Sequence, residues 1–326
     1  MTDKAYLPEG MLLTSEENIY YTSDIKRLEK AMERGIILEG VVTRCDSENM
    51  DLSVEVGRYH GIIPREEAVW SRDGEAAKDI AVITRVGKAA AFKITDIVYL
   101  PSGEPHLILS RRAAQAECDV NYISSLESGD IIPAVVTHLE PFGAFIDIGC
   151  GIISLMTVDS ISVSRISHPR ERFKCGEHIM SIVRSVDRES GRIYMSHREL
   201  LGTWEENAAR FESAQTVTGI VRSIEDYGIF VELSPNLAGL AEYKDGVEVG
   251  DVCAVYIKNI IPEKMKIKLV LIDSAKGSFT HNMKYFIDTD KVRHMPHWKY
   301  SPDGCTKVIE TVFDEKICQK TPDLQK

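Results

Sequence analysis

The stretch PFGAFIDIG, residues 141–149, decides the fold of this chain. Aliphatic residues alternate in it with aromatic and charged ones, which is the pattern of a strand with one buried face. The buried face comprises Ala144, Ile146 and Ile148. The other face carries Phe145 and Asp147, and a carboxylate marks the side toward water. We therefore expect Phe145 to be an aromatic ring exposed on a sheet.

This stretch belongs to the clearest of three internal repeats, which covers residues 129–200. A second copy covers 214–273, and a more divergent copy covers 35–112. Short alternating strands with turn residues between them predict a small closed antiparallel barrel in each copy. We therefore expect a mostly β protein of three tandem five-stranded barrels.

The copy at 214–273 contains YGIFVEL, which alternates in the same way as PFGAFIDIG. Its residues expected to point inward are Ile229, Val231 and Leu233. Phe230 and Glu232 are expected to point outward, toward water.

The segments between the repeats, 113–128 and 201–213, are expected to be helical linkers. Thr203 and Glu206 have the spacing of a capping box, in which each residue satisfies a backbone donor of the other.

The sequence predicts secondary structure for the N-terminal extension but not for the C-terminal one. Residues 1–34 are expected to form an extension with a short helix over 22–34, and Gly35 is a plausible C-cap for it. Residues 274–326 form a C-terminal extension whose fold the sequence leaves open.

The composition indicates a soluble cytoplasmic protein with reduced thiols. No apolar run approaches the roughly 18 residues of a membrane span, and the N-terminus lacks the layout of a signal peptide. The seven cysteines are scattered, which disfavours a disulfide framework. The net charge of -11 over 326 residues argues against coating of nucleic acid through bulk positive charge, but it allows local contacts.

Motifs of enzymes are missing from the sequence. It contains no GxxxxGK[ST], GxSxG or HExxH, so we expect no catalysis and no cofactor. The best metal candidate is in the tail, where His294 and His297 precede Cys305 and Cys318. Zinc uses such residues, but this spacing matches no compact zinc finger, and a structural role is favoured over zinc.

Two pairs of aromatic residues carry the functional signal. Phe142 and Phe145 in the middle repeat have the same spacing as Tyr227 and Phe230 in the copy at 214–273. Exposed rings stack on the bases of single-stranded nucleic acid while basic side chains follow the phosphates. The alternative is that these rings pack against a linker helix or a neighbouring barrel.

The middle repeat resembles the S1 RNA-binding domain, the OB-fold repeat of ribosomal protein S1. The resemblance rests on PFGAFIDIG, on ISHPRERFKCGEHI (166–179) and on SVDRESGRIYMSHREL (185–200). The copy at 214–273 matches through YGIFVEL and GLAEY. With three repeats and helical linkers, the whole chain resembles a short bacterial relative of ribosomal protein S1, and the resemblance implies an OB-fold for each barrel.

In this family, RNA lies across a barrel face made by two aromatic residues, a histidine, an aspartate and an arginine. In the middle repeat the resemblance assigns these roles to Phe142, Phe145, Asp187 and Arg192, and Thr157 replaces the histidine. The further cations expected to contact phosphates are Arg165, Arg170, Arg172 and Lys174.

In the copy at 214–273 the resemblance assigns the aromatic positions to Tyr227 and Phe230 and the arginine position to Lys266. Glu242 replaces the histidine and Ile261 the aspartate. A carboxylate in the groove opposes phosphate contacts, so weaker binding is expected here.

The repeat at 35–112 has Met50 and Ser53 at the aromatic positions. Its outward residues Asp51, Ser53 and Glu55 offer no stacking surface, so it is expected to bind RNA poorly. Packing or the docking of a protein partner is the expected role.

The resulting hypothesis is a non-enzymatic, cytoplasmic protein that binds single-stranded RNA in translation, with mRNA and the small ribosomal subunit as partners. Residence on the ribosome and a role as a free regulator both stay open. Two alternatives are a protein–protein scaffold and an RNA-processing enzyme with its active site in 274–326.

Overall fold

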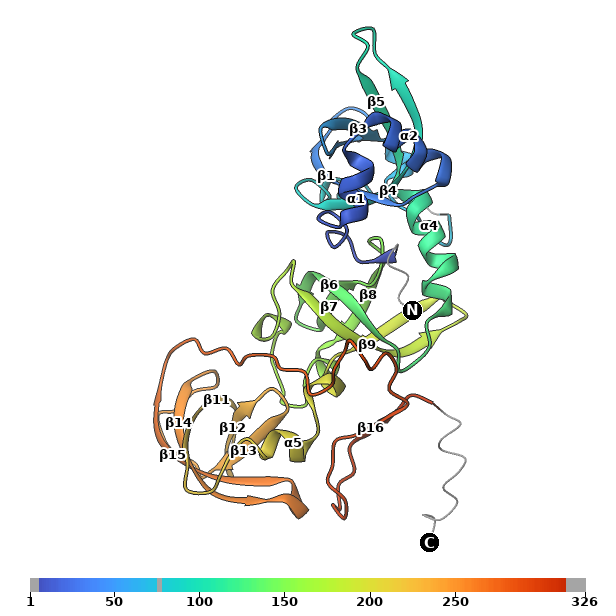
Figure 1. Ribbon diagram of the computed structural model, residues 1–326. Coiled ribbons are helices and arrows are strands. Elements are labelled where there is room, and N and C mark those ends of the chain that lie inside the picture. The colour runs from blue at the N-terminus through green and yellow to red at the C-terminus, as the bar shows by residue number, and fades with distance from the viewer. Residues whose placement is uncertain (1–5, 75–77, 315–326) are drawn as a thin grey trace. The chain divides into compact units, whose positions relative to one another are not determined.

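The structure, a computed structural model, describes residues 6–74 and 78–314. Three closed five-stranded barrels organise the chain (Figure 1). In each barrel the strands neighbour one another in the order first, second, third, fifth, fourth, and the fourth closes on the first. This is the OB-fold arrangement, and the predicted mostly β fold of three barrels is confirmed.

Barrel 1 is preceded by two helices, α1 (Glu16–Thr22) and α2 (Ile25–Arg34). Its strands are β1 (Leu38–Cys45), β2 (Leu52–Val56), β3 (Tyr59–Ile63), β4 (Ala89–Tyr99) and β5 (Pro105–Ser110), and α3 (Asp79–Ile83) lies between β3 and β4. Asp24 caps the start of α2, and Gly35 ends it with a φ of 63°, a conformation that favours glycine. The predicted end of this helix is confirmed.

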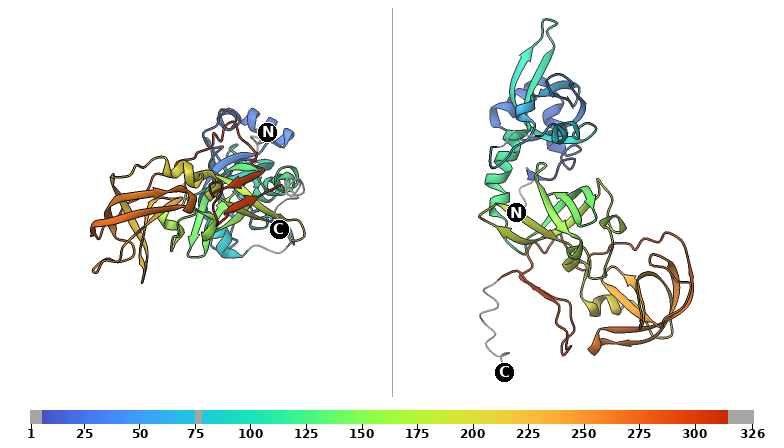
Figure 2. Two further views of the ribbon diagram at one scale, coloured as in Figure 1. Left: turned by 90° about the horizontal axis from the view of Figure 1, so that it is seen from below. Right: turned by 180° about the vertical axis from the view of Figure 1, so that it is seen from behind.

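The hairpin formed by β4 and β5 is the most extended part of barrel 1. Its tip projects beyond the other strands of this barrel in both Figure 1 and the right view of Figure 2. Val98, Tyr99 and Leu100 near the tip are 44%, 56% and 43% exposed. The hairpin therefore presents apolar side chains to solvent.

Barrel 2 follows helix α4 (Arg111–Asn121). Its strands are β6 (Ile131–Glu140), β7 (Gly143–Asp147), β8 (Ile153–Thr157), β9 (His178–Asp187) and β10 (Arg192–Ser196). The three aliphatic residues of PFGAFIDIG are buried, as predicted.

Asp147 corrects the expectation that the charged residue of this strand faces water. It is 2% exposed, and its carboxylate accepts hydrogen bonds from the backbone N–H groups of Glu9 (2.7 Å), Gly149 (2.9 Å) and Gly151 (3.0 Å). Burial and the nearby Glu9 carboxylate raise the pKa of Asp147 to about 7. Two donors from the following turn and one that is 138 residues away in sequence make this burial possible.

Barrel 3 follows the short helix α5 (Trp204–Ala208), which begins with the predicted capping box of Thr203 and Glu206. Its strands are β11 (Thr216–Glu225), β12 (Gly228–Ser234), β13 (Leu237–Ala241), β14 (Val252–Ile261) and β15 (Lys266–Ala275). The inward residues predicted on β12 are buried.

Glu232 is the second correction, at the position in β12 that Asp147 occupies in β7. Its side chain is fully buried, and its Oε2 accepts hydrogen bonds from Arg172 Nη2 at 2.6 Å and Arg222 Nε at 2.7 Å. His281 Nε2 lies 3.4 Å from its Oε1. Two guanidinium groups therefore replace water around this carboxylate.

The C-terminal segment packs into the core that holds barrel 3. It contains the strand pair β16 (His297–Lys299) and β17 (Glu310–Val312). Its buried residues in that core are Met295, Trp298, Tyr300 and Phe313. Met295 N–H also donates to the carbonyl of Gly129, just before β6. The described part of 274–326 is thus an integral part of this core and not a separate domain.

The chain forms two compact units. One contains barrel 1, its helices and two short pieces of barrel 2, and the other contains the rest of barrel 2, barrel 3 and the C-terminal segment. Within residues 6–74 and 78–314, no helix has the length and apolar character needed to cross a membrane.

Candidate nucleic-acid interface

The aromatic pair of barrel 2 lies on its surface. Phe142, in the turn before β7, is 56% exposed, and Phe145 on β7 is half-buried. The two ring centroids are 6.0 Å apart and the ring planes are perpendicular. The edge-to-face contact fixes both rings, and the exposed ring of Phe142 offers a face on which a base can stack.

His138 on β6 extends this pair, although the sequence analysis did not single it out. Its ring centroid lies 6.2 Å from that of Phe145, and its Nε2 lies 2.7 Å from Glu140 Oε1. The sequence could have indicated this residue, because His138 lies on β6, the strand next to β7 with its aromatic residue. A third ring, with hydrogen-bonding nitrogens, therefore belongs to this face.

The hairpin between β9 and β10 carries the expected aspartate and arginine. Asp187 and Arg192 are cross-strand partners, and both are exposed. The Asp187 carboxylate accepts hydrogen bonds from Glu189 N–H, Ser190 N–H and Ser190 Oγ. These hydrogen bonds lower its pKa. Asp187 thus shapes the turn that leads to Arg192.

Thr157, at the family's histidine position, donates to or accepts from Ser160 Oγ at 2.9 Å. Arg184 reaches the same serine from β9, with Nη1 2.5 Å from Ser160 Oγ and 3.5 Å from Asp159 Oδ2. The side chain of Arg184 is 39% exposed. Arg184 is therefore a further cation near Thr157. In the sequence, the only sign of this role is its place on the strand β9.

The basic residues expected near barrel 2 separate into two groups. Arg165, Arg170 and Lys174 are exposed. Arg172 is not, because its side chain is 2% exposed and paired with Glu232. Arg172 was expected to contact a phosphate, and the structure corrects this expectation. Its guanidinium group is buried against a carboxylate and cannot reach a strand of RNA.

Barrel 3 repeats the geometry of the aromatic pair. Tyr227 is 69% exposed, and its ring centroid lies 6.1 Å from that of Phe230 at an interplanar angle of 88°. Lys266 is the cross-strand partner of Ile261, as Arg192 is of Asp187 in barrel 2. Glu242 is exposed directly after β13.

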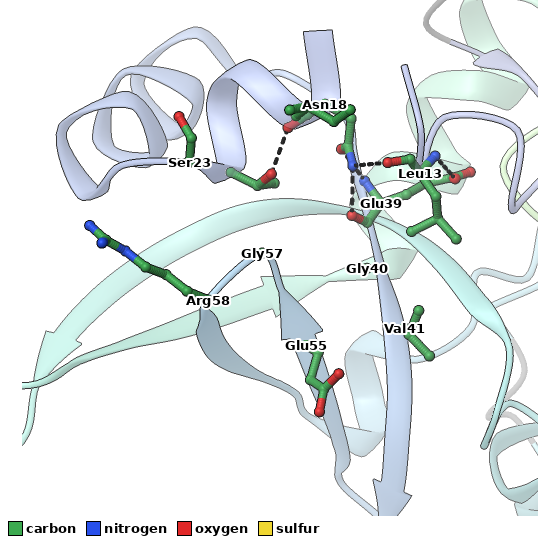
Figure 3. Close-up of a pocket in the computed structure, with 11 residues that line it drawn as sticks. Leu13, Asn18, Ser23, Glu39, Gly40, Val41, Glu55, Gly57 and Arg58 are labelled. Carbon is green, nitrogen blue, oxygen red and sulfur yellow. Dashed lines mark hydrogen bonds between the residues drawn. The ribbon is translucent and has the colours of Figure 1, made fainter. Parts of the chain in front are cut away.

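Barrel 1 presents a different surface. Ser53 and Glu55 lie on the accessible side of β2, and neither is aromatic. Beside this strand and α1 is a cavity of about 480 Å³ (Figure 3). Asn18 spans one wall and donates to the carbonyls of Leu13 and Glu39. No aromatic residue is among the described residues that line this cavity, so stacking has no platform there.

Glu39 supports the wall of the same cavity. Its carboxylate accepts hydrogen bonds from the backbone N–H groups of Gly10, Leu12 and Leu13 at 2.9–3.0 Å. Burial nevertheless raises the pKa of Glu39 to about 8, so the interior of the protein favours the protonated form of this group more than water does.

The histidines and cysteines of the tail lie apart. His294 contacts Asp130 at 2.8 Å and His297 contacts Glu310 at 3.0 Å, while the Cys305 thiol points at the carbonyls of Pro262 and Glu263. Cys318 lies outside the described residues. Among the residues that the structure describes, no three metal-ligating side chains come together.

Comparison with known proteins matches a family model to one of the three barrels. The model of the S1 RNA binding domain family matches residues 125–198, which contain barrel 2. Small ribosomal subunit protein bS1 of Staphylococcus aureus is 30% identical over 246 residues, covering 74% of this chain and 58% of that protein. The chain belongs to the S1-domain family.

Two further relatives of this S1-domain chain are similar over most of its length. The small ribosomal subunit protein bS1 homolog of Bacillus cereus is 28% identical over 325 residues, 95% of this chain and 79% of that protein. Small ribosomal subunit protein bS1 of Rhizobium meliloti is 24% identical over 306 residues, 84% of this chain and 53% of that protein. The S1-domain chain thus spans little more than half the length of two of these relatives. Its family is one of RNA-binding domains and not a class of enzymes.

Proposed function

We propose that this S1-domain protein binds single-stranded RNA, in particular mRNA in translation, with barrel 2 as the main site and barrel 3 as the second. The single observation that carries the proposal is the repeated aromatic pair. Two barrels present an exposed ring in contact with a half-buried one, at centroid distances of 6.0 and 6.1 Å.

On barrel 2, bases stack on Phe142 and Phe145, which tolerates any sequence because every base has a π face. Arg192, Arg170 and Lys174 supply positive charge for the phosphates. Local cations of this kind bind RNA although the whole chain carries a net charge of -11, because screening confines the interaction to nearby groups.

Two binding barrels in one chain raise the affinity for a long strand. When one barrel has bound, the other meets the same RNA at a high effective concentration. Tyr227, Phe230 and Lys266 give barrel 3 this assisting role.

The small ribosomal subunit and a cytoplasmic location are part of the proposal, since the relatives named above are small ribosomal subunit proteins. Barrel 1 is proposed to dock a protein rather than RNA. Its support is the hairpin of β4 and β5, where Val98, Tyr99 and Leu100 are exposed apolar residues. No catalytic role is proposed.

The test is fluorescence anisotropy of a labelled single-stranded RNA across a salt series. Phe142→Ala/Phe145→Ala should lose roughly 2–6 kcal/mol of binding free energy, the range for two stacked bases if the effects add. Tyr99→Ala is the matched control, because it removes an equally exposed ring (56%) from barrel 1, which is not proposed to bind RNA. Binding that ignores the double substitution would move the site elsewhere, and no binding at all would favour a scaffold.

A further inference from the structure

A cavity of about 330 Å³ opens over the aromatic pair of barrel 3. Tyr227 and Phe230 form one side of it, and β11 contributes Arg222. The segment after β8 adds Val163, Ser164 and Arg165, and the C-terminal segment adds Lys307. The size suits one nucleotide, since pockets for small ligands have volumes of roughly 300–1,000 Å³.

The segment that carries Arg165 is fixed to barrel 3 by hydrogen bonds. Val163 N–H donates to Asn236 Oδ1 at 2.9 Å, and Ser164 N–H donates to the carbonyl of Pro235 at 3.1 Å. Arg165 is the next residue along the chain, so its place beside the cavity follows from these bonds.

Lys307 is positioned by the turn that Ser301 closes. Ser301 Oγ donates to the carbonyl of Lys307 at 2.9 Å and accepts from Ile309 N–H at 2.8 Å. Tyr300, beside this serine, is buried and donates to the carbonyl of Asn236. The C-terminal segment therefore holds Lys307 at the cavity.

The charges of the cavity favour a phosphate. Arg222 is neutralised by its ion pairs with Glu171 and Glu232. Within the part of the chain that the structure describes, neither Arg165 nor Lys307 has a side-chain hydrogen bond or an ion pair, and both are exposed. Glu225 also lines the cavity, so the two cations outnumber its one carboxylate.

We infer that this cavity binds one nucleotide of single-stranded RNA, with the base on Tyr227 and Phe230 and the phosphate held by Arg165 and Lys307. The inference rests on the proposed function and adds a composite site to it. The positive charge of these two side chains would offset the carboxylate of Glu242, which was the reason to expect weaker RNA binding by barrel 3.

The experiment measures the anisotropy of a labelled single-stranded RNA with the full chain at several salt concentrations. Arg165→Ala and Lys307→Ala should each weaken binding about fivefold at 0.1 M salt and reduce the salt slope by about 0.7, the contribution of one phosphate contact. Lys307→Glu should weaken it further. Lys264→Ala, an exposed cation of the same barrel outside the cavity, should change affinity less than twofold.

A double-mutant cycle separates this site from a general effect of charge. In a Tyr227→Ala/Phe230→Ala background, the effect of Lys307→Ala should vanish, because the nucleotide no longer sits beside it. An undiminished fivefold effect, or no effect in the intact chain, would overturn the composite site while leaving RNA binding by the protein intact. A wild-type chain that binds no RNA would refute the proposed function itself.

Discussion

The buried carboxylate of Glu232 gives the sharpest prediction from this structure. Glu232→Ala removes the acceptor of Arg172, whose side chain is 2% exposed and cannot turn to water without opening the core. Arg222 keeps Glu171 as a second partner. One uncompensated buried charge therefore results, and breaking a buried ion pair in this way costs about 3–5 kcal/mol.

This loss should be visible in thermal unfolding. For a unit of roughly 150–250 residues, 1 kcal/mol shifts Tm by about 2–4 °C, so Glu232→Ala should lower Tm by about 6–20 °C. Tryptophan fluorescence can report the unfolding of the unit that contains barrel 3, because Trp204 and Trp298 are both in its core. The measurement uses a Trp70→Phe background, which removes the third tryptophan of the chain. Glu263→Ala, at an exposed position, should stay within about 0.5 kcal/mol.

A compensating variant checks the cause. Arg172→Met/Glu232→Leu should recover most of the loss, because an apolar pair of similar volume often replaces a buried ion pair without penalty. The reasoning fails if Glu232→Ala unfolds within the range of the control. It also fails if Arg172→Met keeps its stability and loses salt-dependent RNA binding, which would make Arg172 a phosphate contact.

Four further predictions follow from the site and from buried titratable groups. Arg192→Ala should reduce the salt slope of RNA binding by about 0.7, while Arg44→Ala, 72% exposed on barrel 1, should leave the slope unchanged. Burial lowers the pKa of His197 from 6.5 to about 4, so the unfolded chain binds the extra proton and stability is lost as pH falls through this range, by up to about 3 kcal/mol. Urea titrations should show this slope in the wild type and a flatter one in His197→Gln; equal slopes would contradict it. Burial raises the pKa of Glu39 from 4.5 to about 8, so the folded chain binds the extra proton and stability should fall as pH rises between these values; Glu39→Gln should make that dependence weaker, while the raised pKa of Asp147 maintains part of it. Ser53→Ala should leave RNA affinity within twofold, and a larger loss would place RNA on barrel 1.

The barrels and the aromatic pairs could be predicted because they depend on local pattern. Alternation along a strand fixes which side chains share a face, and it placed Ile146 and Ile229 correctly in the core. The capping residue Thr203 acts within three residues of itself, so the predicted start of α5 is also local, whereas the helix predicted over 22–34 begins only at Ile25, after its cap Asp24.

Alternation does not show whether the outer face of a strand is exposed to solvent or covered by another segment, because that depends on distant parts of the chain. Asp147 and Glu232 point away from their barrel cores, yet other segments cover both of them. Glu9 and Arg172, which supply their partners, are 138 and 60 residues away in sequence. The same limit applies to the cavity of barrel 3, where Arg165 and Lys307 meet only through tertiary packing.

The C-terminal segment imposes an order on folding during synthesis. Barrel 1 has a core of its own, so it can fold once its strands have left the ribosome. The core around barrel 3 lacks Trp298, Tyr300 and Phe313 until the chain beyond them has emerged. During translation, barrel 1 can therefore be folded while the core of the other unit still lacks its last aromatic residues. Truncation of the chain before Trp298 would expose that core to solvent.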